Sequence, residues 1–299
     1  QSFDVPVSDD YLPTCTHFSY PTGEDDGSTA YAYYYPPTNP DVTAPEDDRP
    51  PLVVTVHGGP TSQTLPVADL ERAYLTSRGF AVVDVNYRGS TGYGRAYRDA
   101  LDGEWGVVDT RDCVAVAQYL GHWGVVDPDR LSIRGGSAGG YATLAALAFH
   151  DAFDAGVSYY GVADLRALAT HTHKFESRYL DGLVGPLPEA EDTYEARSPA
   201  THADGIDAPL LALQGGEDRV VPPEQAEELV DALVETETPY AYVEFPDERH
   251  GFRDATAREV ALETETGFYA ETFDLDRSDV PTVDLDVGTF RRRHPTESD

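Results

Sequence analysis

The strongest constraint on this chain is a short glycine-rich run, residues 135–139, which reads G-G-S-A-G and has Ser137 at its centre. An apolar stretch typical of a strand precedes the run, and a pattern typical of a helix follows it. A serine on such a sharp strand-to-helix turn has a strained backbone, needs small neighbours and exposes its hydroxyl. The run therefore predicts that Ser137 is a nucleophile. The alternative is a glycine-rich turn whose serine only caps the helix. A second serine, Ser90, lacks a glycine two residues before it.

A nucleophilic serine needs a base, and the base needs an acid that orients it. In the chain order typical of this kind of turn, the acid and then the histidine follow the serine. Two later strand-like runs, residues 210–213 and 240–245, lead into glycine-containing turns that hold Asp218 and His250. Because functional residues of open α/β sheets gather at the carboxyl ends of the strands, we predict Asp218 as the orienting acid and His250 as the general base. Glu217 is the alternative acid, and a surface position is the alternative for His250.

Acyl transfer also needs hydrogen-bond donors at the place where negative charge develops. Residues 56–60 read V-H-G-G-P, follow an apolar strand and open a glycine-rich loop. This pattern matches the backbone donor loop that accompanies a nucleophile turn. We predict the N–H of Gly59 as one donor and the N–H of Ala138, at a helix N-terminus, as the other. His57 precedes the serine, which is the wrong order for the base, so we interpret it as a side chain that fixes the loop.

Strand-like and helix-like patterns alternate along most of the chain. The strand-like runs are residues 29–35, 52–56, 80–85, 131–133, 155–160, 210–213 and 240–245. The clearest helical patterns are residues 108–120, 141–149, 223–234 and 255–269. This alternation predicts an α/β fold with a mostly parallel central sheet and helices on both faces. Residues 171–197 have no clear period and predict an insertion that caps the site.

The charge balance excludes two classes of partner. The chain has 54 acidic residues against 21 Lys and Arg, a formal net charge of -33. Such a surface repels nucleic acid and anionic membranes, and no apolar run approaches the ~18 residues needed to span a bilayer. The basic run 291–293 is interpreted as part of a solvated tail. With Lys174 as the only lysine, the composition is typical of cytoplasmic proteins of salt-accumulating halophiles. The alternative is an acidic mesophilic protein.

No pattern in the sequence predicts a metal or a cofactor. His171 and His173 form a pair, but no carboxylate or cysteine spacing completes a metal site. Cys15 and Cys113 also lack metal spacing, and a reduced compartment is the simpler interpretation for them, although a disulfide stays open. There is no phosphate-cradling or dinucleotide motif. The prediction is a hydrolytic site that uses protein groups alone.

Five motifs occur in an order that resembles the prolyl oligopeptidase family of serine peptidases. The branch that they resemble most contains the acylaminoacyl-peptidase and dipeptidyl-aminopeptidase-like enzymes. The motifs are H-G-G-P at 57–60, N-Y-R-G-S-T-G-Y-G at 86–94, G-G-S-A-G-G-Y at 135–141, the run 214–223, and H-G-F at 250–252. They extend over most of residues 29–270, and the second motif is much more specific than G-x-S-x-G. The resemblance implies an α/β-hydrolase fold and peptide-bond hydrolysis through an acyl-enzyme without a cofactor.

The resemblance has further implications for the pocket and for the domains. It implies that Tyr159, Tyr160, Val220 and Val221 line the pocket for the residue before the scissile bond. The family carries an N-terminal β-propeller, for which this chain has no room, and the chain contains no methionine. We therefore expect a catalytic domain separated from its propeller, with an upstream targeting signal and the oligomeric state left open. The expected division is a linking remnant, the peptidase domain and a tail: residues 1–28, 29–275 and 276–299.

The function expected from these residues is that of a serine peptidase acting on short peptides. A carboxylesterase acting on small acyl esters is the first alternative, because it uses the same chemistry. A catalytically inactive binding module is the second, and the intact serine, acid and histidine with both glycine loops argue against it.

Overall fold

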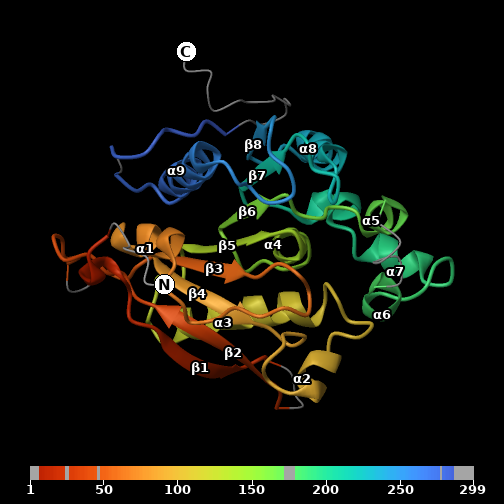
Figure 1. The fold of residues 1–299 in the computed structure, drawn as a ribbon, viewed down its shortest axis with the longest axis horizontal. Coiled ribbons are helices and arrows are strands. Elements are labelled where there is room, and N and C mark those ends of the chain that lie inside the picture. Colours follow the sequence, from red (N-terminus) through yellow and green to blue (C-terminus); the bar gives the residue numbers. More distant parts are fainter. Residues whose placement is uncertain (1–6, 24–26, 46–47, 172–178, 277, 286–299) are drawn as a thin grey trace.

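The computed structural model describes residues 7–23, 27–45, 48–171, 179–276 and 278–285. Its centre is one eight-stranded sheet in the order β1-β2-β4-β3-β5-β6-β7-β8 (Figure 1). The strands are β1 (Thr16–Pro21), β2 (Thr29–Tyr35), β3 (Leu52–Val56), β4 (Ala81–Asn86), β5 (Leu131–Gly136), β6 (Ala155–Tyr159), β7 (Leu210–Gly215) and β8 (Tyr240–Phe245). From β4 to β8 the strands pair in parallel, whereas β1 and β2 are antiparallel additions at one edge. The predicted mostly parallel sheet is confirmed.

Helices cover both faces of the sheet because the parallel strands are apolar on both sides. In β3, Leu52, Val54 and Val56 belong to one core cluster with α3 (Val108–His122), α4 (Ala138–Phe149) and α8 (Pro223–Thr236). Val53 faces the other way and belongs to a second cluster with α1 (Leu70–Ser77) and α9 (Ala255–Thr272). Because successive side chains of a strand point to opposite faces of the sheet, β3 contributes to both core clusters.

The sequence analysis missed two elements that complete the sheet and one of its faces. Strand β1 pairs with β2 over its whole length, so the sheet begins before residue 29, where we expected the domain to start. Only Tyr20 of β1 is buried, which explains why a hydrophobic pattern did not reveal this strand. Helix α1 has an exposed Leu70 and only three buried residues, and the Asp69 side chain caps it by accepting the N–H of Arg72.

The predicted insertion at 171–197 lies partly outside the described residues, since 172–178 are not among them. The described part contains α6 (Tyr179–Leu183) and α7 (Glu191–Ala196), which lie with α5 (Leu165–His171) away from the sheet (Figure 1). The Tyr179 hydroxyl lies 3.1 Å from Oγ1 of Thr61 in the loop after β3. A cap function for this segment stays a prediction. Further short helices are α2 (Arg95–Asp99) and the 3-10 helices Asp9–Tyr11 and Pro199–Gly205. No helix in the described ranges is long and apolar enough to cross a membrane.

Candidate active site

Ser137 lies between the end of β5 and the start of α4, with φ 57° and ψ -118°. This is a backbone conformation that side chains rarely adopt. The turn is closed by two glycines that leave no space for a side chain. A Cβ on Gly135 would lie 2.4 Å from the carbonyl oxygen of Gly139, and a Cβ on Gly139 would lie 2.2 Å from the carbonyl oxygen of Val56. The end of β5, the start of α4 and the end of β3 approach so closely that positions 135 and 139 must be glycine.

The structure brings together the three side chains that the sequence analysis singled out. Oγ of Ser137 lies 2.8 Å from Nε2 of His250, and Nδ1 of His250 lies 2.8 Å from Oδ2 of Asp218. An ionised carboxylate only accepts hydrogen bonds, so Nδ1 carries the ring proton and Nε2 accepts from the serine hydroxyl. The arrangement is a continuous hydrogen-bonded chain from carboxylate to hydroxyl.

The loop after β7 fixes the carboxylate of Asp218. Its Oδ1 accepts the backbone N–H groups of Val220 at 2.8 Å and Val221 at 3.0 Å, which leaves Oδ2 for His250. The Asp218 side chain has no exposed area. By contrast, the neighbouring Glu217 side chain is 52% exposed and pairs with Arg249 at 3.3 Å. Of the two adjacent carboxylates, only Asp218 contacts the histidine.

A buried carboxylate that the sequence analysis did not single out holds the histidine loop. Glu248 accepts the backbone N–H groups of Arg253 and Asp254 at 2.9 and 2.8 Å, and so closes the turn around His250. Its backbone carbonyl accepts the N–H of Glu217, which ties the histidine loop to the loop after β7. The H-G-F motif gave no signal for this residue, because an acidic residue in a polar turn has no distinctive pattern.

The loop after β3, residues 57–64, is called the donor loop below. It packs directly on the serine turn, since a Cβ on Gly58 would lie 3.0 Å from the carbonyl oxygen of Gly136. Gly59 has φ 68°, a left-handed conformation that favours glycine. His57 of this loop has its Nε2 2.8 Å from Oγ of Ser90, and Ser90 is fully buried. The competing serine of the sequence analysis is therefore a buried partner of His57.

The four predicted pocket residues lie in different surroundings. The Tyr160 ring contacts His250 at 5.0 Å between centroids, and Tyr160 has a positive φ of 39°. The Tyr159 hydroxyl points away and donates to the buried Glu265 at 2.5 Å. Val220 is 41% exposed, whereas Val221 is buried. Their role in binding substrate stays a prediction.

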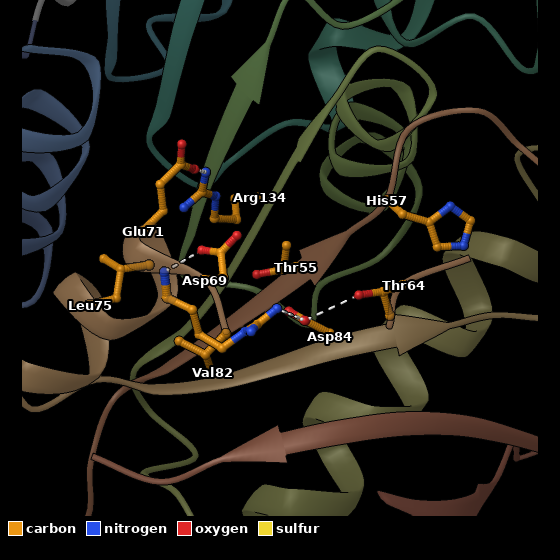
Figure 2. Close-up of a pocket in the computed structure, with 10 residues that line it drawn as sticks. Thr55, His57, Thr64, Asp69, Glu71, Leu75, Val82, Asp84 and Arg134 are labelled. Carbon is orange, nitrogen blue, oxygen red and sulfur yellow. Dashed lines mark hydrogen bonds and ion pairs between the residues drawn. The ribbon is translucent and has the colours of Figure 1, made fainter. Parts of the chain in front are cut away.

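A polar cavity of about 200 Å³ lies next to the donor loop, between α1 and the strands β3, β4 and β5 (Figure 2). Its lining comes from the donor loop, from β3, β4 and β5, and from α1, and includes His57, Thr64, Arg72, Asp84 and Arg134. Thr64 points to Asp84, which also forms an ion pair with Arg72 (Figure 2). The described residues contain no cluster that could hold a metal ion. The side chains of His171 and His173 lie outside the described part.

Known proteins resemble this chain in sequence and in structure. The sequence profile of the prolyl oligopeptidase family matches residues 66–276. The chain is 35% identical over 254 residues to dipeptidyl aminopeptidase BIII of Pseudoxanthomonas mexicana, covering 82% of this chain and 37% of that protein. It is 31% identical over 208 residues to an acylamino-acid-releasing enzyme of Arabidopsis thaliana, covering 67% of this chain and 27% of that enzyme.

Among solved structures, a Mycobacterium tuberculosis puromycin-hydrolyzing peptidase superposes with a TM-score of 0.90 at 50% identity, covering 93% of this chain and 42% of that one. A puromycin hydrolase superposes with a TM-score of 0.91 at 46% identity, covering 94% and 42%. The chain spans less than half the length of these relatives. The α/β-hydrolase fold and the family resemblance inferred from the motifs are confirmed, and the chain belongs to the prolyl oligopeptidase family.

Proposed function

We propose that this chain hydrolyses peptide bonds of short peptides through an acyl-enzyme, with Ser137 as nucleophile, His250 as general base and Asp218 as orienting acid. The observation that carries the proposal is the hydrogen-bonded chain through these three side chains, at 2.8 Å for each contact of the histidine. The family supports the same reaction class, since the relatives named above are peptidases.

The order of bond changes follows from the tautomer of His250. Oγ of Ser137 attacks the scissile carbonyl carbon while its proton moves to Nε2, and Asp218 stabilises the imidazolium that forms. The N–H groups of Gly59 and Ala138 stabilise the oxyanion of the tetrahedral intermediate. The C–N bond then breaks, and the leaving amine takes the proton from Nε2. Water repeats the sequence on the acyl-enzyme ester and regenerates the serine hydroxyl.

The substrate class is proposed from the relatives together with the site. The names of these relatives refer to dipeptidyl aminopeptidase, acylamino-acid-releasing and puromycin-hydrolysing activities. We therefore expect short peptides and aminoacyl amides as substrates, with Tyr160 and Val221 near the residue before the scissile bond. A β-propeller that restricts substrate size and a cytoplasmic location remain parts of this proposal.

The test compares three substrates on the purified chain: a peptide anilide, puromycin and a short-chain p-nitrophenyl ester. A fluorescent phosphonate, which labels only an activated serine, is applied in parallel, with Ser137→Ala as the unlabelled control. Turnover of the anilide or puromycin with labelling of Ser137 supports the proposal. Turnover of the ester alone would make the chain an esterase, and neither turnover nor labelling would make it a binding module.

A further inference from the structure

The donor loop is held from one side by the segment that links β4 to α2, residues 86–92, called the support segment below. The Asn86 side chain imitates a strand neighbour: its Oδ1 accepts the N–H of Thr64 at 2.9 Å and its Nδ2 donates to the carbonyl of Thr64 at 3.2 Å. The Tyr87 hydroxyl donates to the carbonyl oxygen of Pro60 at 2.9 Å. The last residue of the donor loop, Thr64, and Pro60 nearer its start are therefore both bonded to the start of the support segment.

The middle of the donor loop is bonded to Thr91 of the support segment. The N–H of Thr91 donates to the carbonyl oxygen of Ser62 at 2.8 Å, and its Oγ1 donates to the carbonyl oxygen of Thr61 at 2.7 Å. With the contacts of Asn86 and Tyr87, four carbonyl groups of the donor loop are satisfied from one neighbouring segment. These hydrogen bonds give the N-Y-R-G-S-T-G-Y-G motif a structural role that the sequence alone did not reveal.

The first and last residues of the donor loop, His57 and Thr64, line the polar cavity (Figure 2). The residues between them do not line it, and Gly58, Gly59, Ser62 and Gln63 are exposed. A loop that is exposed along much of its length gains little from close packing, which requires contact on both sides. Besides its contact with the serine turn, the hydrogen bonds of the support segment therefore fix its position.

The support segment itself is firmly anchored. The N–H of Arg88 donates to Oδ2 of Asp112 on α3 at 2.7 Å, and the Arg88 guanidinium donates to Oδ1 of the same carboxylate at 2.8 Å. Both side chains are buried, and bidentate pairing of this type fixes geometry as well as charge. The support segment therefore holds the donor loop in a fixed position relative to α3.

Ser90 holds the donor loop through His57, whose ring is stacked on the Tyr87 ring at 4.4 Å. Nδ1 of His57 lies 3.3 Å from the carbonyl oxygen of Gly58, which can only accept, so Nδ1 carries the proton and Nε2 accepts from the Ser90 hydroxyl. Burial lowers the pKa of His57 to about 4, so the ring is neutral at neutral pH and Nε2 stays an acceptor. The hydrogen bond from Nδ1 to the Gly58 carbonyl orients the peptide group between Gly58 and Gly59, which carries the Gly59 N–H.

We infer that the support segment positions the donor loop for oxyanion stabilisation, and that Ser90 is a positioning residue that acts on the N–H of Gly59 through His57. This inference rests on the proposed function, because the proposed function gives the Gly59 N–H its role as a donor to the oxyanion. A donor aimed at the oxyanion acts only when the charge has formed, so its displacement lowers kcat and leaves KM nearly unchanged. Loss of a whole donor costs about 100- to 1,000-fold in kcat elsewhere, so a displaced donor should cost about 10- to 100-fold.

The test is Ser90→Ala beside a matched control, Ser132→Ala. Ser132 is equally buried and donates one hydrogen bond, to the carbonyl of Leu52 at 2.8 Å, but it lies at the far end of β5. Two inhibitors are compared: a peptidyl trifluoromethyl ketone, which forms a tetrahedral oxyanion on the serine, and a product-like peptide carboxylate, which does not. In Ser90→Ala, kcat and ketone affinity should fall together by about 10- to 100-fold, with KM and carboxylate affinity within about twofold.

Two results would overturn the inference. One is a kcat for Ser90→Ala equal to that of Ser132→Ala, and the other is an equal loss of affinity for both inhibitors. If Ser90→Ala does not fold, Thr91→Val replaces it, because Thr91 is exposed and the change removes only its bond to Thr61. That variant should show a several-fold loss of kcat, with the same selective loss of affinity for the ketone. A kcat equal to that of the unmodified chain would contradict the inference. A failure of the proposed function is distinct, because the unmodified chain would then neither turn over peptide nor take the phosphonate.

Discussion

Asp218 holds Nδ1 of His250 at 2.8 Å with one carboxylate oxygen, while its other oxygen is fixed by two backbone N–H groups. The carboxylate cannot turn away from the ring without losing these bonds. Glu217, one residue earlier, is half exposed and pairs with Arg249 instead. The orientation of the histidine thus depends on one of two adjacent acids.

Asp218→Asn should lower kcat by about 10,000-fold, because an amide nitrogen facing Nδ1 favours the wrong tautomer of His250. Glu217→Gln is the matched control, since it makes the same chemical change one residue away on the surface, and its kcat should stay within about twofold. Steady-state kinetics on a peptide anilide measure both. If the two variants exchanged these outcomes, Glu217 would be the acid.

Ser137→Ala should lower kcat by about a million-fold, as loss of the nucleophile does in other triads. A second change at this position tests the backbone. With φ 57°, Ser137 has a conformation that glycine adopts without cost, so Ser137→Gly should be more stable to unfolding than Ser137→Ala by about 1 kcal/mol. Denaturant unfolding of the two inactive variants measures the difference. Equal stability would mean that the turn is not strained.

Asp109 should make the protein less stable as pH rises. Burial raises the pKa of this carboxyl from 3.8 to about 7. The folded state then holds a proton that the unfolded state releases, so stability is fully present below about pH 4 and is lost as pH rises to 7, by about 4 kcal/mol at most. Asp109→Asn keeps the acceptor for the N–H of Gly106 and stays neutral.

The Asn variant should therefore be more stable than the unmodified protein at pH 8 and nearly equal to it at pH 4, where the carboxyl is protonated in the folded state and largely so in the unfolded state. Denaturant unfolding at the two pH values measures this, with Asp204→Asn as the control at an exposed position. A gain of the same size at both pH values would exclude the ionisation of Asp109 as the cause.

Salt should stabilise the chain, because a net charge of -33 on one compact surface favours the expanded state. The Debye length falls from about 30 Å at 0.01 M salt to about 3 Å at 1 M. In molar salt, therefore, only neighbouring acidic groups still repel one another. Tm and kcat should both rise from dilute buffer to molar KCl. The slope should be shallower at pH 5, where fewer carboxylates are charged. A Tm that is flat or falls with KCl would exclude adaptation to salt and would leave the proposed site unaffected.

The sequence by itself determined the parts of this protein that short-range sterics dictate. The serine turn could be recognised because Gly135 and Gly139 are needed wherever a strand end, a helix start and a neighbouring strand meet within contact distance. The parallel strands could be recognised because burial on both faces requires continuous apolar runs. The chain order of Ser137, Asp218 and His250 followed from the same pattern of strands and turns.

Only the tertiary structure decided which of several similar residues contact one another. Asp218 and Glu217 differ by one position in a turn, and the direction of that turn buries one and exposes the other. Ser90 and His57 are 33 residues apart, and only the pairing of β3 with β4 brings their loops together at 2.8 Å. Strand β1 and helix α1 have few buried side chains, so tertiary contacts rather than local pattern define them. Local sequence specifies conformation through sterics, whereas partners distant in the chain are chosen by the packing of the whole sheet.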